Sequence, residues 1–201
     1  MKQWLRRLDF LLVGSVLFSL VPLLTRVHLV EDDFLELYAI ADGIYQDVGY
    51  CFDKLESYAG LTQLTGYTAR PPLVPLLLAG AFQMFGRNLL AIYLVYFLPR
   101  LLIAPLLYLI ARFYLPKVYA FLVATLPFFF FFFDTYAIST LKADVFVVAL
   151  SLAGLYFYLK SLRNRRLLFP LLAGVSLGLN LLSKETATTF SLALLAIAAG
   201  N

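Results

Sequence analysis

The stretch "RPPLVPLLLAGAFQMFG" (residues 70 to 86) fixes how this chain can be threaded through a membrane. As a helix, its apolar part at 71 to 86 would be only about 24 Å long, whereas the hydrocarbon core of a bilayer is about 30 Å thick. A full crossing here would put the basic cluster "KSLRNRR" (160 to 166) outside, against the positive-inside rule. A helix at the external interface would leave every basic cluster in the cytoplasm. We therefore predict an interfacial helix at 71 to 86.

The composition indicates a membrane protein. Of the 201 residues, 62% are hydrophobic and 14% are charged, whereas about one quarter of a soluble domain is charged. Repeated long apolar runs are typical of membrane spans. We predict an all-α fold, a multi-pass transmembrane helical bundle that forms a single membrane domain. Its other parts are a span at 10–28, an external loop at 29–70 with short amphipathic helices, and spans at 89–111, 118–138, 145–162, 167–183 and 187–200.

The charged residues and the single cysteine predict the orientation of the first span and exclude some kinds of partner and site. Lys2, Arg6 and Arg7 precede the first span and no small-residue cleavage site follows it, so we predict a retained signal-anchor helix with a cytoplasmic N-terminus. The net charge of +4 is scattered among the spans, which argues against a nucleic-acid partner. Cys51 is the single cysteine, which excludes a disulfide within these residues and a cysteine-based metal site.

This orientation gathers many charged residues at one end of the bundle. On the predicted external side, at or near span ends, lie Asp32, Asp33, Arg70, Asp144, Lys184 and Glu185. Arg100 lies within the predicted span at 89–111. Charges inside or at the mouth of membrane spans are costly and tend to face a cavity. The external end is therefore the candidate site.

Asp32 and Asp33 are candidates for a general base. Carboxylates at an interface can have a raised pKa through partial desolvation, which suits a base that works near neutral pH. On a helix that starts here, Asp32 and Glu36 share one face. The alternative is an N-terminal turn whose acids only complement the helix dipole and cap the backbone. Spacing alone favours this alternative.

The basic candidates each have two interpretations. Prolines that start the interfacial helix would present Arg70 to the outer leaflet, where guanidinium binds phosphate bidentately or merely anchors the helix by snorkelling. Arg100 could serve a site or pair with Asp134 or Asp144 across helices. The stretch "GVSLGLN" (174 to 180), with small residues four apart at Gly174 and Gly178, predicts a small-residue packing face.

The order of these pieces resembles the membrane-embedded glycosyltransferases of the GT-C class. After the first span come "EDDFLELYAIADG", "RPPLVPLLLAGAFQMFG" and "PRLL", then "KAD" before a span and "GVSLGLNLLSK" at the end of the next. The pattern covers nearly the whole chain. It is most similar to the superfamily of dolichyl-phosphate-mannose protein mannosyltransferases and lipid A aminoarabinose transferases.

The resemblance implies roles for particular residues. An acidic pair in the first outer loop acts as base and binds the acceptor in that family, and Asp32 and Asp33 match it. The family's tyrosine often follows the first acid by four residues, whereas Tyr38 follows by six or five, so the choice between the two acids stays open. The remaining residues that match family positions are Arg70 and Lys184, which would contact the lipid-linked phosphate, Arg100 and Asp144.

The resemblance also implies an activity and its surroundings. A sugar would pass from a polyprenyl-phosphate donor to a protein, lipid or glycan acceptor at the external face of a prokaryotic plasma membrane. The acids could hold a divalent cation, although the sequence offers no full ligand set, and no other cofactor is implied. Family members are usually more than twice as long, which implies that these residues are the N-terminal part of a longer protein.

Two other functions remain open at this point. A transporter or flippase of lipid-linked substrates would use intramembrane charges to mark a substrate path. Such a protein should have repeated halves with matching broken helices, and the sequence shows no repeat. A non-catalytic membrane subunit would carry the "EDD" acids (31 to 33) only as a solvated loop. Substitution of Asp32 and Asp33 would separate that subunit from an enzyme.

Overall fold

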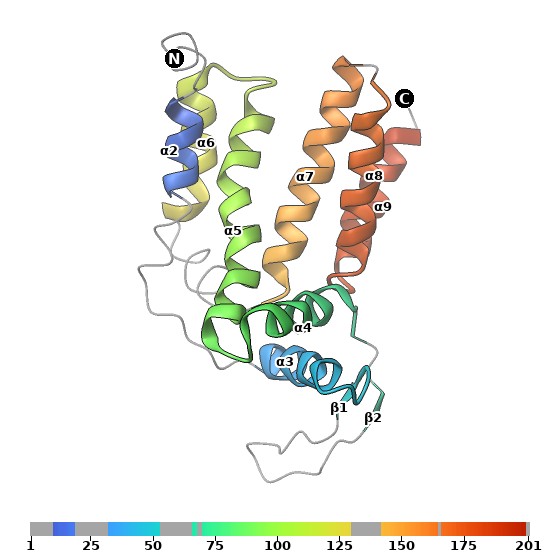
Figure 1. The fold of residues 1–201 in the computed structure, drawn as a ribbon. Coiled ribbons are helices and arrows are strands. Elements are labelled where there is room, and N and C mark those ends of the chain that lie inside the picture. The colour runs from blue at the N-terminus through green and yellow to red at the C-terminus, as the bar shows by residue number, and fades with distance from the viewer. Residues whose placement is uncertain are drawn as a thin grey trace.

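The computed structural model describes residues 10–18, 32–52, 66–67, 70–129, 142–164 and 166–199, which are almost entirely helical (Figure 1). In chain order the elements are α2 Phe10–Phe18, α3 Asp32–Tyr45, β1 Cys51–Phe52, β2 Gly66–Tyr67, α4 Leu73–Phe85, α5 Leu89–Ala111, α6 Lys117–Phe129, α7 Asp144–Arg163, α8 Leu168–Leu181 and α9 Ala187–Ala199. Several predicted features lie outside the described residues, namely the side chains of Asp32 and Asp33, all of Asp134 and Arg165, and parts of the spans at 10–28 and 118–138.

The predicted helical class is confirmed. The sequence analysis did not predict the short antiparallel ladder, in which Cys51 pairs with Tyr67 and Phe52 with Gly66. Among the described residues, α5 and α7 are long and apolar enough to cross a membrane. Helices α4 and α8 are apolar but shorter, and so is the apolar part of α6. The number of membrane crossings therefore stays a prediction.

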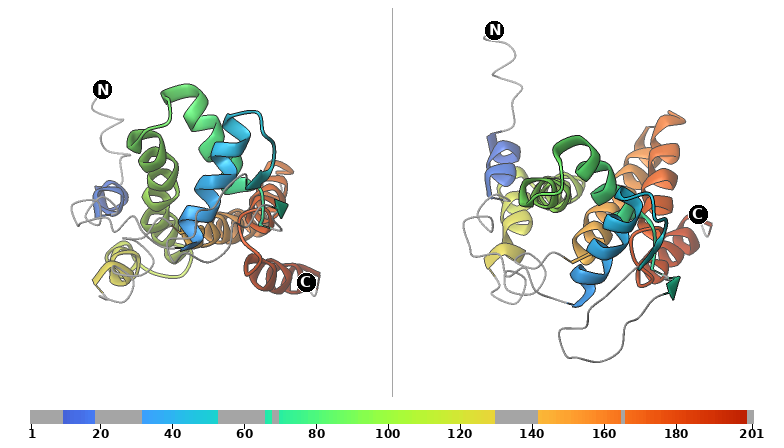
Figure 2. Two further views of the ribbon diagram at one scale, coloured as in Figure 1. Left: turned by 90° about the horizontal axis from the view of Figure 1, so that it is seen from below. Right: turned by 60° about the horizontal axis from the view of Figure 1, so that its bottom comes forward.

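The helices form an upright bundle with two helices laid across one end. In Figure 1, α5 and α7 run side by side through the middle, with α2 and α6 on one flank and α8 and α9 on the other. Helices α3 and α4 lie across the lower end, and the view from below in Figure 2 shows them over its middle, with α2, α6 and α9 to the sides. The start of α5 contacts α4, the start of α7 packs into the same apolar cluster as α3 and α4, and Leu182 just after α8 accepts a hydrogen bond from Leu73.

Periodic apolar residues attach the crosspiece to the bundle. Helix α4 turns Val74, Leu78 and Phe82 inward at a spacing of four residues, and all three are at most 1% exposed. The Phe82 ring meets the Tyr38 ring of α3, with their centroids 5.5 Å apart. Tyr96 of α5 continues the same apolar cluster into the bundle. Burying each such side chain contributes roughly 1.5–3 kcal/mol, so this cluster fixes the crosspiece.

On the other flank of the bundle, small residues let α6 pack closely against α5. Ala120 and Ala124 of α6 are one turn apart and fully buried against Tyr108 and Ala111 of α5. Leu11 of α2 packs against the same cluster. With no side chain beyond Cβ, the alanines allow neighbouring helices to lie near one another. This second cluster is separate from the one beneath the crosspiece.

The prediction of a packing face at Gly174 and Gly178 is wrong for the described part of the chain. No described heavy atom outside their own helix lies within 4 Å of the place where a Cβ on either residue would sit. The close approach occurs instead at Gly154 of α7, where an added Cβ would lie 2.9 Å from Leu177 of α8. Asn180 lies on the opposite face of α8, which faces α7, and its side-chain amide donates a hydrogen bond to the Ser151 hydroxyl at 2.9 Å. This bond gives the buried amide the partner that it needs.

Candidate functional site

A backbone hydrogen bond ties the start of α4 to the end of α8. The Leu73 amide donates to the Leu182 carbonyl oxygen at 2.8 Å. The first amides of a helix have no partner within it, so this bond satisfies one that would otherwise need water. Pro72, at the N-cap position, has no amide hydrogen to satisfy. The residues before α4 therefore lie beside the turn that joins α8 to α9.

Arg70, just before α4, is bound to the crosspiece helix α3. Its Nε donates to Glu36 Oε2 at 2.7 Å, and its second guanidinium nitrogen lies 2.6 Å from the same oxygen. The two side chains are 33% and 25% exposed. Charge-assisted bonds of this kind hold a guanidinium in a defined direction. Arg70 is thus positioned by a carboxylate that the sequence analysis noted only as a neighbour of Asp32.

Lys184, in the α8–α9 turn, is bound to the start of α7. Its Nζ donates to both carboxylate oxygens of Asp144, at 2.9 and 2.8 Å. Asp144 is the first residue of α7, where a negative charge also complements the helix dipole. Two of the predicted residues therefore form one ion pair. Asp144 therefore holds the Lys184 ammonium in position and partly neutralises its positive charge.

Arg70 and Lys184 line the same cleft at the crosspiece end. The cleft is narrow: its cavity volume is about 10 Å³, roughly the room that one water molecule needs, and it opens to solvent at its mouth. Its lining residues are Leu37, Arg70, Pro71, Ala143, Ser183, Lys184 and Glu185. Two cations from distant parts of the sequence thus face one space. Each of them also contacts a carboxylate at the margin of the cleft, Glu36 for Arg70 and Asp144 for Lys184, which holds the cation in place.

Tyr50, which the sequence analysis missed, supports Arg70 without being one of the described residues that line the cleft. Its hydroxyl donates to the Arg70 carbonyl oxygen at 2.6 Å. Burial raises the pKa of the Tyr50 hydroxyl above its ordinary 10.0, and the negative charges of Glu185 and Glu36 raise it further. Tyr50 is therefore a neutral donor at physiological pH. It follows α3 in a polar segment without periodicity, so its sequence carried no signal for this role.

The remaining predicted residues are Asp32, Asp33 and Arg100, and of these the described side chain of Arg100 does not line the cleft. Asp32 and Asp33 form the start of α3, one helical turn before Glu36 and Leu37 respectively. Their side chains lie outside the described residues, so their contacts stay predictions. Arg100 is 4% exposed within α5. It lies one turn beyond Tyr96, whose ring meets that of Phe34 in α3 with centroids 6.2 Å apart.

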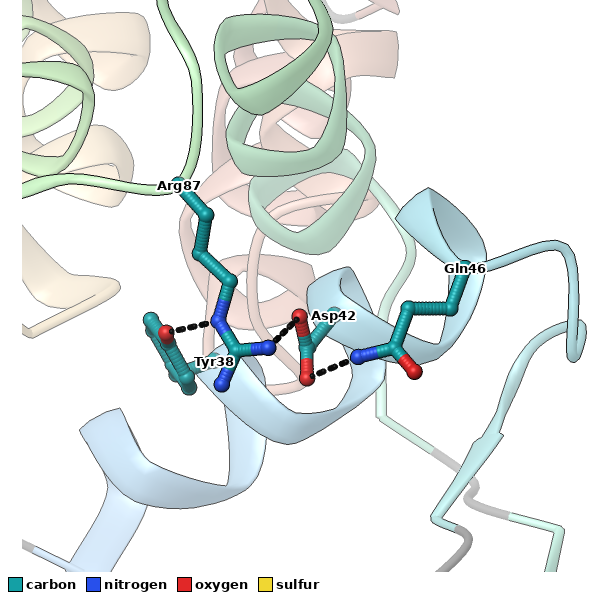
Figure 3. A network of polar contacts seen from close by, with 4 residues as sticks. All are labelled: Tyr38, Asp42, Gln46 and Arg87. Atoms are coloured by element: carbon teal, nitrogen blue, oxygen red, sulfur yellow. Dashed lines mark hydrogen bonds and ion pairs between the residues drawn. The ribbon is translucent and has the colours of Figure 1, made fainter.

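A second arginine binds α3 away from the cleft (Figure 3). Arg87, in the connection after α4, donates through Nε to the Tyr38 hydroxyl at 2.8 Å and lies 3.1 Å from Asp42 Oδ1. Gln46 donates to the other oxygen of Asp42 at 2.8 Å. Tyr38 therefore holds the crosspiece together in this structure. It does not line the cleft of Arg70 and Lys184.

Comparison with known families now identifies the chain. A model of the dolichyl-phosphate-mannose-protein mannosyltransferase family matches residues 69–201. The chain belongs to this family. The predicted resemblance is therefore confirmed, and membership in the mannosyltransferase family indicates membrane glycosyltransferase activity. No curated protein and no solved structure matches the chain.

The family match covers part of the candidate site. It begins one residue before Arg70 and includes Arg100, Asp144 and Lys184. Asp32 and Asp33 precede the matched residues, so their roles stay predictions. Among the described residues, no group of three or more histidine, cysteine, aspartate or glutamate side chains could hold a metal ion. The described side chains therefore offer no ligand set for the divalent cation that the sequence analysis considered.

Proposed function

We propose that this mannosyltransferase-family protein transfers a sugar from a polyprenyl-phosphate donor to an acceptor hydroxyl at the external face of a prokaryotic plasma membrane. One observation carries the proposal: Arg70 and Lys184, far apart in the sequence, line one cleft at the crosspiece end. Two cations converging on a single space suit a phosphate group. Each is held in place by a carboxylate, so little reorganisation is needed when the phosphate binds.

The charge change during transfer explains why two cations are useful. The acceptor oxygen forms a bond to the anomeric carbon, with inversion, while the bond from that carbon to the phosphate oxygen breaks. The acceptor proton passes to Asp32 or Asp33. The donor phosphate carries one negative charge as a diester, and the leaving lipid phosphate carries nearly two. Arg70 and Lys184, with Arg100 deeper in the bundle, would stabilise this added charge more strongly than the ground state.

The distribution of basic residues supports the proposed orientation. Arg112 and Lys117 flank the connection between α5 and α6, and Lys160, Arg163 and Arg166 flank that between α7 and α8. Both connections lie at the end of the bundle opposite the crosspiece (Figure 1). The positive-inside rule then puts that end and the N-terminus in the cytoplasm. The cleft of Arg70 and Lys184 faces outward, where α3 and α4 would lie at the membrane surface.

A transfer assay tests the proposal. Membranes that contain the full-length protein would be supplied with radiolabelled sugars on a panel of polyprenyl phosphates. We expect transfer from one donor, and loss of that transfer in Asp32→Asn or Asp33→Asn. Asp47→Asn is the matched control, because Asp47 is an exposed acid in the same external segment with a φ of 59° that asparagine also tolerates.

Three results would count against the proposal. A correctly inserted full-length protein that transfers sugar from no donor would leave a non-catalytic membrane subunit as the better interpretation. Equal loss of transfer in Asp47→Asn and in both other variants would show that the assay reports charge or stability of the loop. Transfer that survives both Asp32→Asn and Asp33→Asn would place the base elsewhere.

A further inference from the structure

A cationic cavity lies at the end of the bundle away from the candidate active site. It opens widely to solvent between the last turn of α5 and the last turns of α7, and its volume is about 350 Å³. Its polar and aromatic lining consists of Arg112, Phe113, Tyr156, Lys160, Arg163 and Asn164. No described residue that lines it is acidic. The described lining of the cavity therefore carries three positive charges and no negative one.

The three cations contact neutral groups. Arg112 donates to the Leu115 carbonyl oxygen at 2.7 Å, and Arg163 donates to the Phe113 carbonyl oxygen at 2.7 Å. Lys160 Nζ lies 3.1 Å from the Tyr156 hydroxyl oxygen. Within the part of the chain that the structure describes, none of the three forms an ion pair with a carboxylate. Their mutual repulsion is thus uncompensated by this part of the protein.

Aromatic rings hold two of these cations without neutralising them. The Arg163 guanidinium carbon lies 4.5 Å from the centroid of the Phe113 ring. Lys160 Nζ lies 4.7 Å from the centroid of Phe169 and 5.3 Å from that of Tyr156. Such contacts orient a cation and leave its full charge available. An arginine has five N–H donors, and only one on Arg163 and one on Arg112 bond within the described structure.

The surroundings indicate where an anion would come from. Large apolar side chains at this end are well exposed, with Tyr114 at 69%, Leu162 at 60% and Leu167 at 86%. Arginine and lysine at the ends of spanning helices lie at the depth of lipid head groups, and basic pockets between helices bind anionic lipids. We propose that this cavity binds the phosphate of an anionic lipid head group in the leaflet opposite the candidate active site. The inference rests on membrane placement and is independent of the transfer reaction.

The phosphate would replace the missing negative charge. Its oxygens suit the forked donors of Arg112 and Arg163, and the Lys160 ammonium adds a third donor. The Asn164 amide and the Tyr156 hydroxyl offer neutral hydrogen bonds to the glycerol part of a head group. Acyl chains would lie against the exposed apolar residues of the rim. A bound lipid would thereby link the end of α5 to the end of α7. Without it, these ends contact each other mainly through aromatic rings, such as those of Phe113 and Tyr156.

A lipid-binding measurement tests this inference without any sugar donor. Full-length protein in detergent would be titrated with phosphatidylglycerol, and bound lipid would be counted by native mass spectrometry. We expect Lys160→Gln and Arg163→Gln each to weaken binding about tenfold, as removal of a charge-assisted hydrogen bond predicts. Arg166→Gln is the control, because it removes the same charge at the same end from an exposed residue outside the cavity lining.

Two further controls are needed. One shows whether the bound phosphate belongs to a lipid or is free phosphate, and the other shows that a substituted protein still folds. Phosphatidylcholine should bind at least tenfold more weakly, and inorganic phosphate alone should not displace phosphatidylglycerol. Lys160→Arg should retain binding, since it keeps the charge in a folded protein. Equal weakening by Arg166→Gln, equal binding of the two lipids, or displacement by inorganic phosphate would each overturn the proposal. Because this experiment measures no sugar transfer, a negative result would not bear on the proposed enzyme function. A negative result in the transfer assay would likewise not bear on lipid binding.

Discussion

The two ends of the helix bundle use the same basic residues in different ways. At the crosspiece end, Arg70 and Lys184 each contact a carboxylate and line one cleft. At the opposite end, Lys160 and Arg163 contact a hydroxyl, a carbonyl and aromatic rings. The first arrangement fixes cations in direction at little net charge, which suits a reacting group whose charge changes. The second keeps net positive charge, which suits permanent attraction of an anion.

The largest expected effect concerns the attachment of the crosspiece end. Phe82 is 1% exposed beneath α3, so Phe82→Ala should lower the free energy of unfolding by about 3 kcal/mol through lost burial and a cavity. Thermal unfolding of the purified protein would measure it. Phe85→Ala is the control on the same helix, because Phe85 is 46% exposed. A similar cost for both variants would mean that α4 is not held by its inward face.

The next effect concerns the charge that develops at the cleft. Lys184→Gln keeps a hydrogen-bond donor beside Asp144 but removes the positive charge, so the turnover number in the transfer assay should fall about a hundredfold. Arg166→Gln removes the same charge at the opposite end and should leave turnover within a few-fold of wild type. If the two variants lose equal activity, net charge matters and the cleft does not.

The smallest effect is a dependence of stability on alkaline pH. Because burial and the charges of Glu185 and Glu36 raise the pKa of Tyr50 in the folded protein, its neutral form stabilises the fold fully below the unfolded value of about 10. That contribution is lost as the pH rises through the higher folded pKa. The thermal midpoint should therefore fall less steeply above about pH 10 in Tyr50→Phe than in wild type. Parallel curves for the two proteins would mean that neither burial nor the two carboxylates raise the pKa of Tyr50 in the folded protein.

Much of the fold could be predicted because local patterns determine it. The long apolar runs indicated helices, and α5 occupies Leu89–Ala111, the same residues as the predicted range. The acids at Asp32 indicated a helix start, which is where α3 begins. Such features depend on neighbours within a few positions. The family resemblance rested on the order of several such patterns and was confirmed by the match over residues 69–201.

Contacts between distant segments could not be predicted in the same way. The bonds of Arg70 to Glu36 and of Lys184 to Asp144 depend on how α3, α4, α7 and α8 pack, which no local spacing reveals. The error at Gly174 has the same origin, because a sequence does not say which face of α8 meets α7. The sequence analysis placed Arg70, Asp144 and Lys184 at one end of the bundle. It could not say which carboxylate would hold which cation.

The most direct test of the central claim compares the two arginines that bind α3. Arg70 precedes α4 and lines the cleft, whereas Arg87 follows α4 and does not, yet each forms an ion pair with an acid of α3. Partly exposed pairs of this kind contribute at most about 1 kcal/mol, so Arg70→Gln and Arg87→Gln should lower stability to a similar, small extent.

Sugar transfer from the polyprenyl-phosphate donor should separate the two variants. We predict that Arg70→Gln lowers turnover about a hundredfold, because the phosphate loses a positioned cation, and that Arg87→Gln stays within a few-fold of wild type. That result would establish the cleft of Arg70 and Lys184 as the place where the lipid phosphate leaves. Equal turnover in the two variants, whether both are active or both are impaired, would contradict the account.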